Sequence, residues 1–109
     1  MPLVEIAKQN AHEVVPGYTA RFIHTEQMTF AYWHVHAGAT LPLHSHEHEQ
    51  VAHVLEGVFE LTVDGVSYEL VPGKIFVIPR NVPHSGRAIT DCSLLDVFNP
   101  VRADYQARD

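Results

Sequence analysis

The chain has 109 residues, with 13 acidic and seven basic side chains and a formal charge of −6. This length suits one domain with one core, and the negative charge argues against non-specific binding to nucleic acid or to an anionic membrane. The single cysteine, Cys92, excludes an intrachain disulfide and a multi-cysteine zinc site. No apolar run is long enough to span a membrane, and the first residues do not resemble a signal peptide. We therefore expect a cytoplasmic protein. Its nine histidines are the outlier, because six of them lie between His34 and His53.

Short segments of β-type sequence follow one another along the chain. Residues 18–24 and 28–36 are rich in aromatic and β-branched side chains and predict an antiparallel pair. Residues 59–63 and 66–70 alternate apolar and polar side chains around Asp64-Gly65, the strongest two-residue hairpin signal. This hairpin is the most secure local prediction.

The later part of the chain continues the pattern. Residues 75–78 predict a buried strand that ends at Pro79, and residues 92–98 a last strand that ends before Asn99-Pro100. We expect roughly eight strands and no convincing helix, hence a barrel or a two-sheet sandwich. The first dozen residues and the tail after Tyr105 are expected to be loose.

One segment also allows a helical interpretation. Val51, Val54 and Leu55 have helical spacing, and His48-Glu49 could then suggest a metalloprotease helix. That motif needs its second histidine four residues after the first, whereas His53 follows His48 by five. We therefore favour a strand.

The histidine cluster has the composition of a metal site. In a strand, residues two apart share a face, so His44 and His46 can direct two imidazoles to one interior. Gln50 can add a carbonyl oxygen, and His84 follows a turn stiffened by Pro79 and Pro83. Three nitrogens and one oxygen leave open positions on a divalent transition metal.

The spacing of these residues resembles the two cupin motifs. The first motif is matched by Gly38, His44, His46, Gln50 and Gly57, and the second by Gly73, Pro79 and His84. The chain is therefore identified as a member of the small cupins. The resemblance implies an all-β fold, a single-domain cupin over residues 1–109 with a jelly-roll barrel (double-stranded β-helix) at about 18–100. It also implies one metal ion bound by His44, His46, Gln50 and His84, with Ni, Zn, Mn, Fe and Cu not distinguished.

Three positions depart from the usual cupin pattern. Gln50 replaces the usual glutamate, Asn81 a glycine, and Ala88 the usual late asparagine. Asn81 is a mild change because asparagine tolerates the left-handed backbone. Gln50 leaves the metal with its full charge, which favours gripping an anionic substrate over holding a redox metal at low potential.

The final segment resembles that of the KdgF-type pectin-degradation cupins. In that group an aspartate, a phenylalanine and an arginine line the pocket, and the matching residues here are Asp96, Phe98 and Arg102. The resemblance implies conversion of unsaturated uronates to linear keto-deoxy sugars. Asp96 would move a proton, Phe98 would face the sugar ring, and Arg102 would bind the carboxylate.

Several of these residues can also have a purely structural role. Asp96 can serve only to satisfy the backbone or an arginine, and an arginine near a terminus, such as Arg102, is usually solvated. His48 is expected beside the ligands or in solvent, and His34 and His36 on a strand without a ligand role.

Two other functions stay open. Three histidines with free coordination positions also suit a dioxygenase, although the absence of a carboxylate at Gln50 weighs against it. The third possibility is a cupin that binds a small ligand without turnover. In each case the partner is a small molecule, and exposed apolar strands such as residues 28–33 predict a homodimer.

Overall fold

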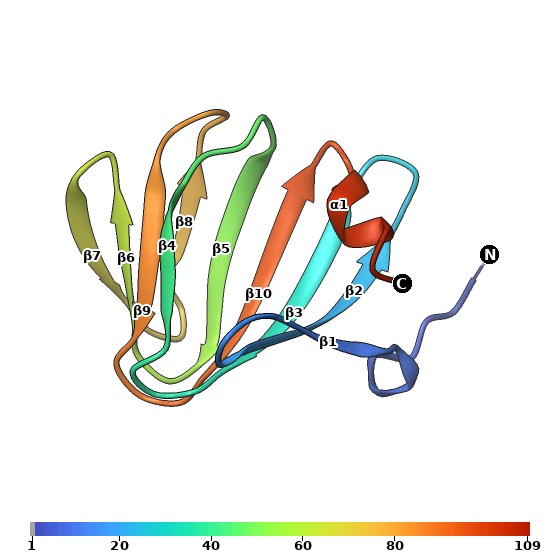
Figure 1. Ribbon diagram of the computed structural model, residues 1–109, viewed down its shortest axis with the longest axis horizontal. Coiled ribbons are helices and arrows are strands. Elements are labelled where there is room, and N and C mark those ends of the chain that lie inside the picture. The colour runs from blue at the N-terminus through green and yellow to red at the C-terminus, as the bar shows by residue number, and fades with distance from the viewer. Residues whose placement is uncertain (1) are drawn as a thin grey trace.

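The computed structural model describes residues 2–109, which form ten strands in two antiparallel sheets (Figure 1). The six-stranded sheet has the order β1 (Ala11–Val15), β2 (Tyr18–His24), β3 (Thr29–Val35), β10 (Cys92–Asn99), β5 (Glu49–Glu56) and β8 (Ile75–Ile78). The four-stranded sheet has the order β4 (Thr40–His44), β9 (His84–Ala88), β6 (Phe59–Val63) and β7 (Val66–Leu70). The predicted all-β, two-sheet architecture is confirmed.

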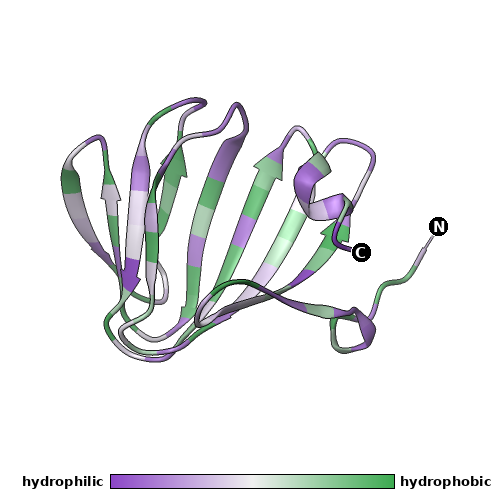
Figure 2. Ribbon diagram, viewed as in Figure 1, coloured by the Kyte–Doolittle hydropathy of each residue, from purple (hydrophilic) through white to green (hydrophobic). Residues whose placement is uncertain are grey.

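Alternation of apolar and polar residues places the core between the sheets, and Figure 2 shows it as bands of opposite hydropathy along the strands. Along β2 and β3, Phe22, Trp33 and Val35 are buried, and on β10 Phe98 is buried. Aromatic contacts connect part of this core, with Phe22 and Trp33 in an edge-to-face contact at 6.1 Å between centroids. One face of each of these strands is therefore committed to the interior.

The backbone confirms two local predictions. Asp64 and Gly65 have φ of 48° and 80°, as a type I′ hairpin turn requires, and they join β6 to β7. Asn81 has φ of 63°, so asparagine does take the left-handed conformation at the position where cupins usually have glycine. The helical interpretation of residues 51–55 is wrong, because they lie within β5 and pair with β10 and β8.

Other expectations need correction. The strand at residues 75–78 was expected to be buried, but β8 is the edge of its sheet, and Ile75 and Val77 are 58% and 51% exposed. The structure also has more strands than expected: β1 pairs with β2, and its first two residues, Ala11 and His12, belong to the first dozen residues that were expected to be loose. Two short helical turns flank the barrel, η1 (Ile6–Lys8) and α1 (Ala103–Gln106).

Gly57 is the glycine with the tightest surroundings. Its φ is +91°, and a Cβ there would overlap the carbonyl oxygen of Asp91 and lie 2.8 Å from Oγ1 of Thr90. Gly65 has a similar φ of +80° but open space around it. A comparison of substitutions at Gly57 and Gly65 therefore separates the cost of the left-handed backbone from the cost of the steric overlap.

We expect Gly57→Ala to lower the free energy of unfolding by about 3 kcal/mol or more, because the left-handed strain and the collision add. The matched Gly65→Ala variant should lose only about 1–2 kcal/mol, the cost of the left-handed backbone alone. Urea denaturation measures both values. Equal losses in the two variants would show that the Asp91 carbonyl moves away at no cost.

Candidate metal centre

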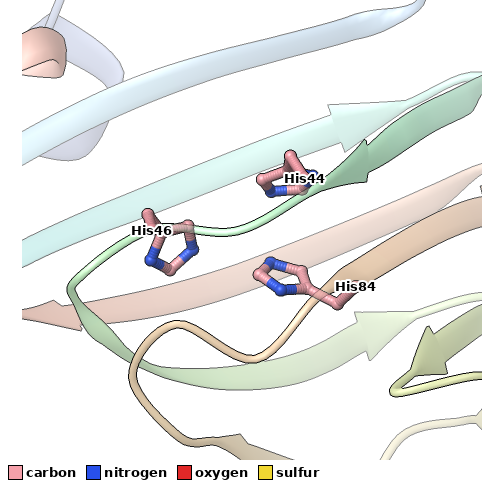
Figure 3. A group of neighbouring side chains, drawn as sticks. All are labelled: His44, His46 and His84. Atoms are coloured by element: carbon pink, nitrogen blue, oxygen red, sulfur yellow. The ribbon is translucent and has the colours of Figure 1, made fainter.

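Two strands of the smaller sheet bring the two motifs together. β4 and β9 are antiparallel neighbours, and His44 lies directly opposite His84 in their register. The ring centroids of these two histidines are 4.2 Å apart, and that of His46, just beyond the end of β4, lies 5.0 Å from that of His84. Ligand nitrogens of all three lie within 4.8 Å of one another (Figure 3). The structure thus assembles the three histidines that the sequence selected.

Hydrogen bonds fix the orientation of two of these rings. Nδ1 of His44 donates to the carbonyl of Pro42 at 2.8 Å, and Nδ1 of His84 donates to that of Val82 at 2.9 Å. Because a carbonyl only accepts, the proton is on Nδ1 and Nε2 carries the free lone pair. Nε2 of His84 is buried and has no protein partner among residues 2–109. An orphaned buried acceptor of this kind fits a metal ion.

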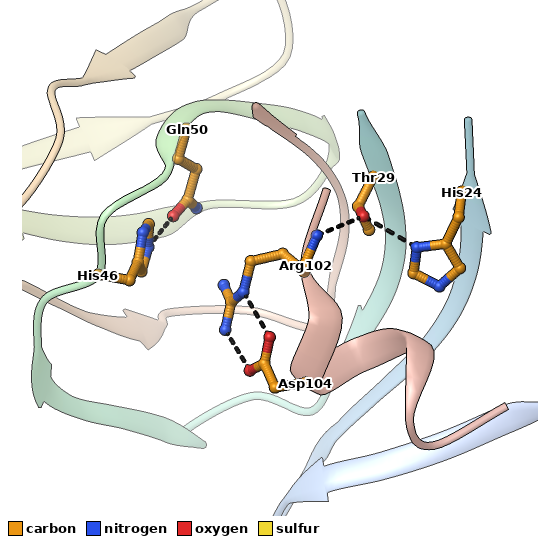
Figure 4. A network of polar contacts seen from close by, with 6 residues as sticks. All are labelled: His24, Thr29, His46, Gln50, Arg102 and Asp104. Carbon is orange, nitrogen blue, oxygen red and sulfur yellow. Dashed lines mark hydrogen bonds and ion pairs between the residues drawn. The ribbon is translucent and has the colours of Figure 1, made fainter. Parts of the chain in front are cut away.

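The side chains of Gln50 and His46 also lie close to each other. Gln50 lies on the inner face of β5 and is buried, and its Oε1 is 3.1 Å from Nε2 of His46 (Figure 4). Two ligands at right angles, each about 2.1 Å from one ion, would be about 3 Å apart. Both atoms can therefore hold the same metal.

The surroundings of His46 and His84 favour their neutral form. Burial, aided by the positive charge of Arg102, lowers the pKa of His46 to about 4, and burial also lowers the pKa of His84. Neutral imidazole is the form that ligates metals. The donor set of His44, His46, His84 and Gln50 therefore fits a divalent transition metal with open positions.

Asp96 and Phe98 lie on the same face of β10, opposite Ala52 and Gln50 of β5. Both line a cavity of about 180 Å³ that also includes His44, His84 and Arg102. Burial raises the pKa of Asp96 to about 6, while Gln50, Trp33 and Arg102 act in the opposite direction. A carboxyl group of this kind can give or take a proton near neutral pH.

Arg102 is buried rather than solvated, with 9% of its surface exposed. Its guanidinium carbon lies 4.7 Å from the centroid of the Phe98 ring and 4.0 Å from that of Tyr105. Its Nε and Nη2 donate to the two carboxylate oxygens of Asp104 at 2.9 and 2.7 Å. The general expectation for an arginine near a terminus is therefore wrong here.

The remaining histidines lie outside the ligand set. His34 and His36 are exposed and contact each other, with ring centroids 5.3 Å apart. The His48 ring is partly buried beside those of His46 and Phe98, at 5.3 and 6.4 Å. His34 lies on β3 and His48 beside the cluster, as expected, whereas His36 lies just after the end of β3 and not on a strand.

Two polar residues of the site gave no signal in the sequence. The hydroxyl of Thr29, fully buried, accepts the backbone N–H of Arg102 at 2.9 Å and lies 2.9 Å from Nδ1 of His24 (Figure 4). Asp104 pairs with Arg102 through both of its carboxylate oxygens. Both depend on where the chain after β10 lies, which sequence patterns do not give.

Comparison with known proteins identifies the family. Residues 31–98 match the family model of the cupin domain. The chain is a cupin. The matched segment runs from β3 to β10 and includes all three clustered histidines.

Individual relatives narrow the match. The pectin degradation protein KdgF of Dickeya dadantii is 34% identical over 74 residues, which cover 66% of this chain and 67% of that protein. The quercetin 2,3-dioxygenase of Bacillus subtilis is 46% identical over 52 residues, but these cover only 15% of its length. The sequence therefore places this cupin with the KdgF proteins over most of their length, and with the dioxygenase only locally.

Solved structures agree. KdgF from Halomonas sp. superposes with a TM-score of 0.85 and 30% identity, covering 91% of this chain and 93% of that one. An RmlC-like cupin from Shewanella frigidimarina gives a TM-score of 0.86 at 29% identity. The predicted resemblance to KdgF-type cupins is confirmed.

Proposed function

We propose that this cupin is a metal-dependent enzyme that converts an unsaturated uronate, or a related small carbohydrate acid, to a linear keto-deoxy sugar. The observation that carries the proposal is the meeting of three parts in one cavity: a His/Gln donor set, a carboxyl group with a raised pKa, and a buried arginine. The KdgF relatives, which match most of the chain, support it.

The proposed conversion is an isomerisation. The hemiacetal C1–O5 bond breaks as the C1 hydroxyl loses its proton, which leaves an aldehyde and an enol at C5. The enol then becomes a ketone when C4 gains a proton, so no atoms are gained or lost overall. A bound divalent metal supplies Lewis acidity toward substrate oxygens.

The side chains account for the remaining steps. Asp96 carries the proton between oxygen and C4, which requires a carboxyl group that changes state near neutral pH. Phe98 offers a flat apolar wall to the sugar ring. Arg102 binds the uronate carboxylate, since its planar fork matches a carboxylate. The cavity of about 180 Å³ is below the range for drug-sized ligands and suits a single sugar ring.

The test is the loss of ultraviolet absorbance of an unsaturated uronate, produced by a polysaccharide lyase, in the presence of metal-loaded protein. We expect loss well above the spontaneous rate. Loss at the spontaneous rate with every metal tried would remove the proposal. Tight binding of the sugar without turnover would instead indicate a ligand-binding cupin.

A dioxygenase is the second candidate, because 52 residues of the chain are 46% identical to a quercetin 2,3-dioxygenase. Gln50 supplies a neutral amide where that chemistry would favour a carboxylate. Oxygen uptake by iron-loaded protein with phenols or diketones would establish this function in place of the first.

The outer face of the six-stranded sheet supports a homodimer. The strand registers align one apolar residue from each of five neighbouring strands in a single row: Ile23, Phe30, Val97, Val51 and Val77. Covering such a row stabilises an assembly by removing apolar surface from water. We place this dimer in the cytoplasm, where the single buried thiol of Cys92 stays reduced.

We expect Val77→Glu to weaken the dimer by about tenfold or more, because it buries a charge in the interface. Val66→Glu is the matched control, since Val66 is similarly exposed at 53% but lies on β7 of the other sheet. Light scattering at micromolar concentration gives the masses. A monomeric wild-type protein, or equal masses for both variants, would contradict the prediction.

A further inference from the structure

The guanidinium of Arg102 is already engaged on one of its two bidentate edges. Nε and Nη2 both donate to the carboxylate of Asp104, at 2.9 and 2.7 Å. An arginine fork has a second edge, formed by Nη1 and the other hydrogen of Nη2, which can take another carboxylate. One arginine can therefore hold Asp104 and a bound anion together.

The direction of that second edge follows from how the side chain lies. Figure 4 shows the guanidinium between Asp104 on one side and His46 with Gln50 on the other. The rings of Phe98 and Tyr105 pack beside it, with their planes 78° apart. The free edge therefore faces the histidine cluster.

The backbone of Arg102 is held as well. Its N–H donates to the buried hydroxyl of Thr29, and Tyr105 stacks on Phe22 of β2 with centroids 4.4 Å apart. The main chain at Arg102 and the Tyr105 ring beside its side chain are thus both held. The bidentate ion pair with Asp104 fixes the rotation of the guanidinium, and a hydrogen bond with Tyr105 adds to it.

We propose that Asp104 is a positioning residue that locks Arg102 so that its free edge is presented to the cavity as a carboxylate receptor. The inference deepens the proposed function, on which its choice of a uronate rests. Asp104 lies at the cavity wall beside Arg102, with its side chain 60% exposed, and both of its carboxylate oxygens are taken up by the guanidinium.

Positioning and simple charge make opposite predictions for Asp104. An acidic group near an anion site repels the anion, so on charge alone its removal should tighten binding. If Asp104 positions Arg102, its removal frees a long side chain that must be ordered again at each binding event, which weakens binding. The sign of the change therefore identifies the mechanism.

The experiment compares wild type, Asp104→Asn and Glu47→Gln, all as purified holoprotein. Glu47 is an exposed acid beside the histidine cluster, so Glu47→Gln makes the same charge change without touching Arg102. The probes are D-galacturonate and neutral D-galactose, with affinities from calorimetry. The Nε–Hε signal of Arg102 in ¹⁵N NMR shows directly whether the guanidinium is held in one orientation.

We expect wild type to prefer galacturonate, Asp104→Asn to bind it about tenfold more weakly, and Glu47→Gln to match or exceed wild type. The Arg102 Nε–Hε signal should be sharp in wild type and broadened in Asp104→Asn. Equal or tighter binding by Asp104→Asn, an unchanged signal, or no preference of wild type for galacturonate would each overturn the inference. If wild type shows the expected binding pattern but converts no unsaturated uronate, the proposed reaction fails and the positioning role stands.

Discussion

Replacing Asp96 with asparagine should lower kcat for the unsaturated uronate by about 10²-fold or more, the usual contribution of a positioned proton carrier. Asparagine keeps the shape of the side chain but cannot exchange a proton. The ligand residues are untouched, so the metal content should stay at the wild-type level. The coupled absorbance assay and metal analysis check the two halves of this prediction.

The same variant should be more stable than wild type at neutral pH. In the folded protein burial raises the pKa of Asp96 to about 6, above the value of about 3.9 for an unfolded chain. The unfolded state therefore loses this proton more readily, and stability is lost as the pH rises from about 4 to about 6. The Asp96→Asn variant does not undergo this decrease in the free energy of unfolding, which amounts to up to about 3 kcal/mol.

Thermal unfolding of the metal-free proteins at several pH values measures this difference. We expect Asp96→Asn to exceed wild type at pH 7.5 and to equal it below pH 4. Asp64→Asn, the same chemical change at an exposed side chain in the β6–β7 turn, should leave kcat unchanged. An Asp96→Asn variant with wild-type activity would show that Asp96 takes no part in the reaction.

Replacing His44 and His84 together with alanine should abolish metal binding. Losing a group that merely supports a ligand costs about 10–100-fold in metal affinity, so losing two direct ligands should cost more than about 100-fold. The purified variant should contain almost no metal, and uronate conversion should fall to the spontaneous rate. Metal analysis by mass spectrometry and the absorbance assay measure both.

The matched control is His34→Ala with His36→Ala. That pair has the same spacing as His44 and His46 but is exposed on β3 and in the turn after it. It should keep its metal and its activity. Circular dichroism checks whether the double variant at His44 and His84 is folded, and a folded variant that retains full metal would show that the ion is bound elsewhere.

The histidine cluster was predictable because the spacing of His44, His46 and His84 matches the two cupin motifs. The strand argument for His44 and His46 was wrong, since β4 ends at His44 and His46 lies just beyond it. Asp96 and Phe98 were selected by the resemblance to KdgF-type cupins, and both lie on one face of the regular strand β10.

The surroundings of Arg102 were not predictable in this way. Its burial depends on the path of the chain after β10, on the ring of Tyr105 and on the hydroxyl of Thr29, which is 73 residues away in sequence. Likewise, β8 reads as a buried strand, yet it forms the edge of its sheet, because strand order is set by long-range pairing. An apolar pattern indicates that residues are kept from water. It does not distinguish a residue in the core of one chain from a residue in an interface between two subunits.

The register that places His44 opposite His84 also links metal binding to folding. These ligands are 40 residues apart in sequence, so an ion held by both acts as a reversible cross-link between β4 and β9. A ligand that binds only the folded state adds about 2.7 kcal/mol of stability at 100 times its dissociation constant. The resistance of this cupin to unfolding is therefore a property of the chain together with the free metal concentration around it.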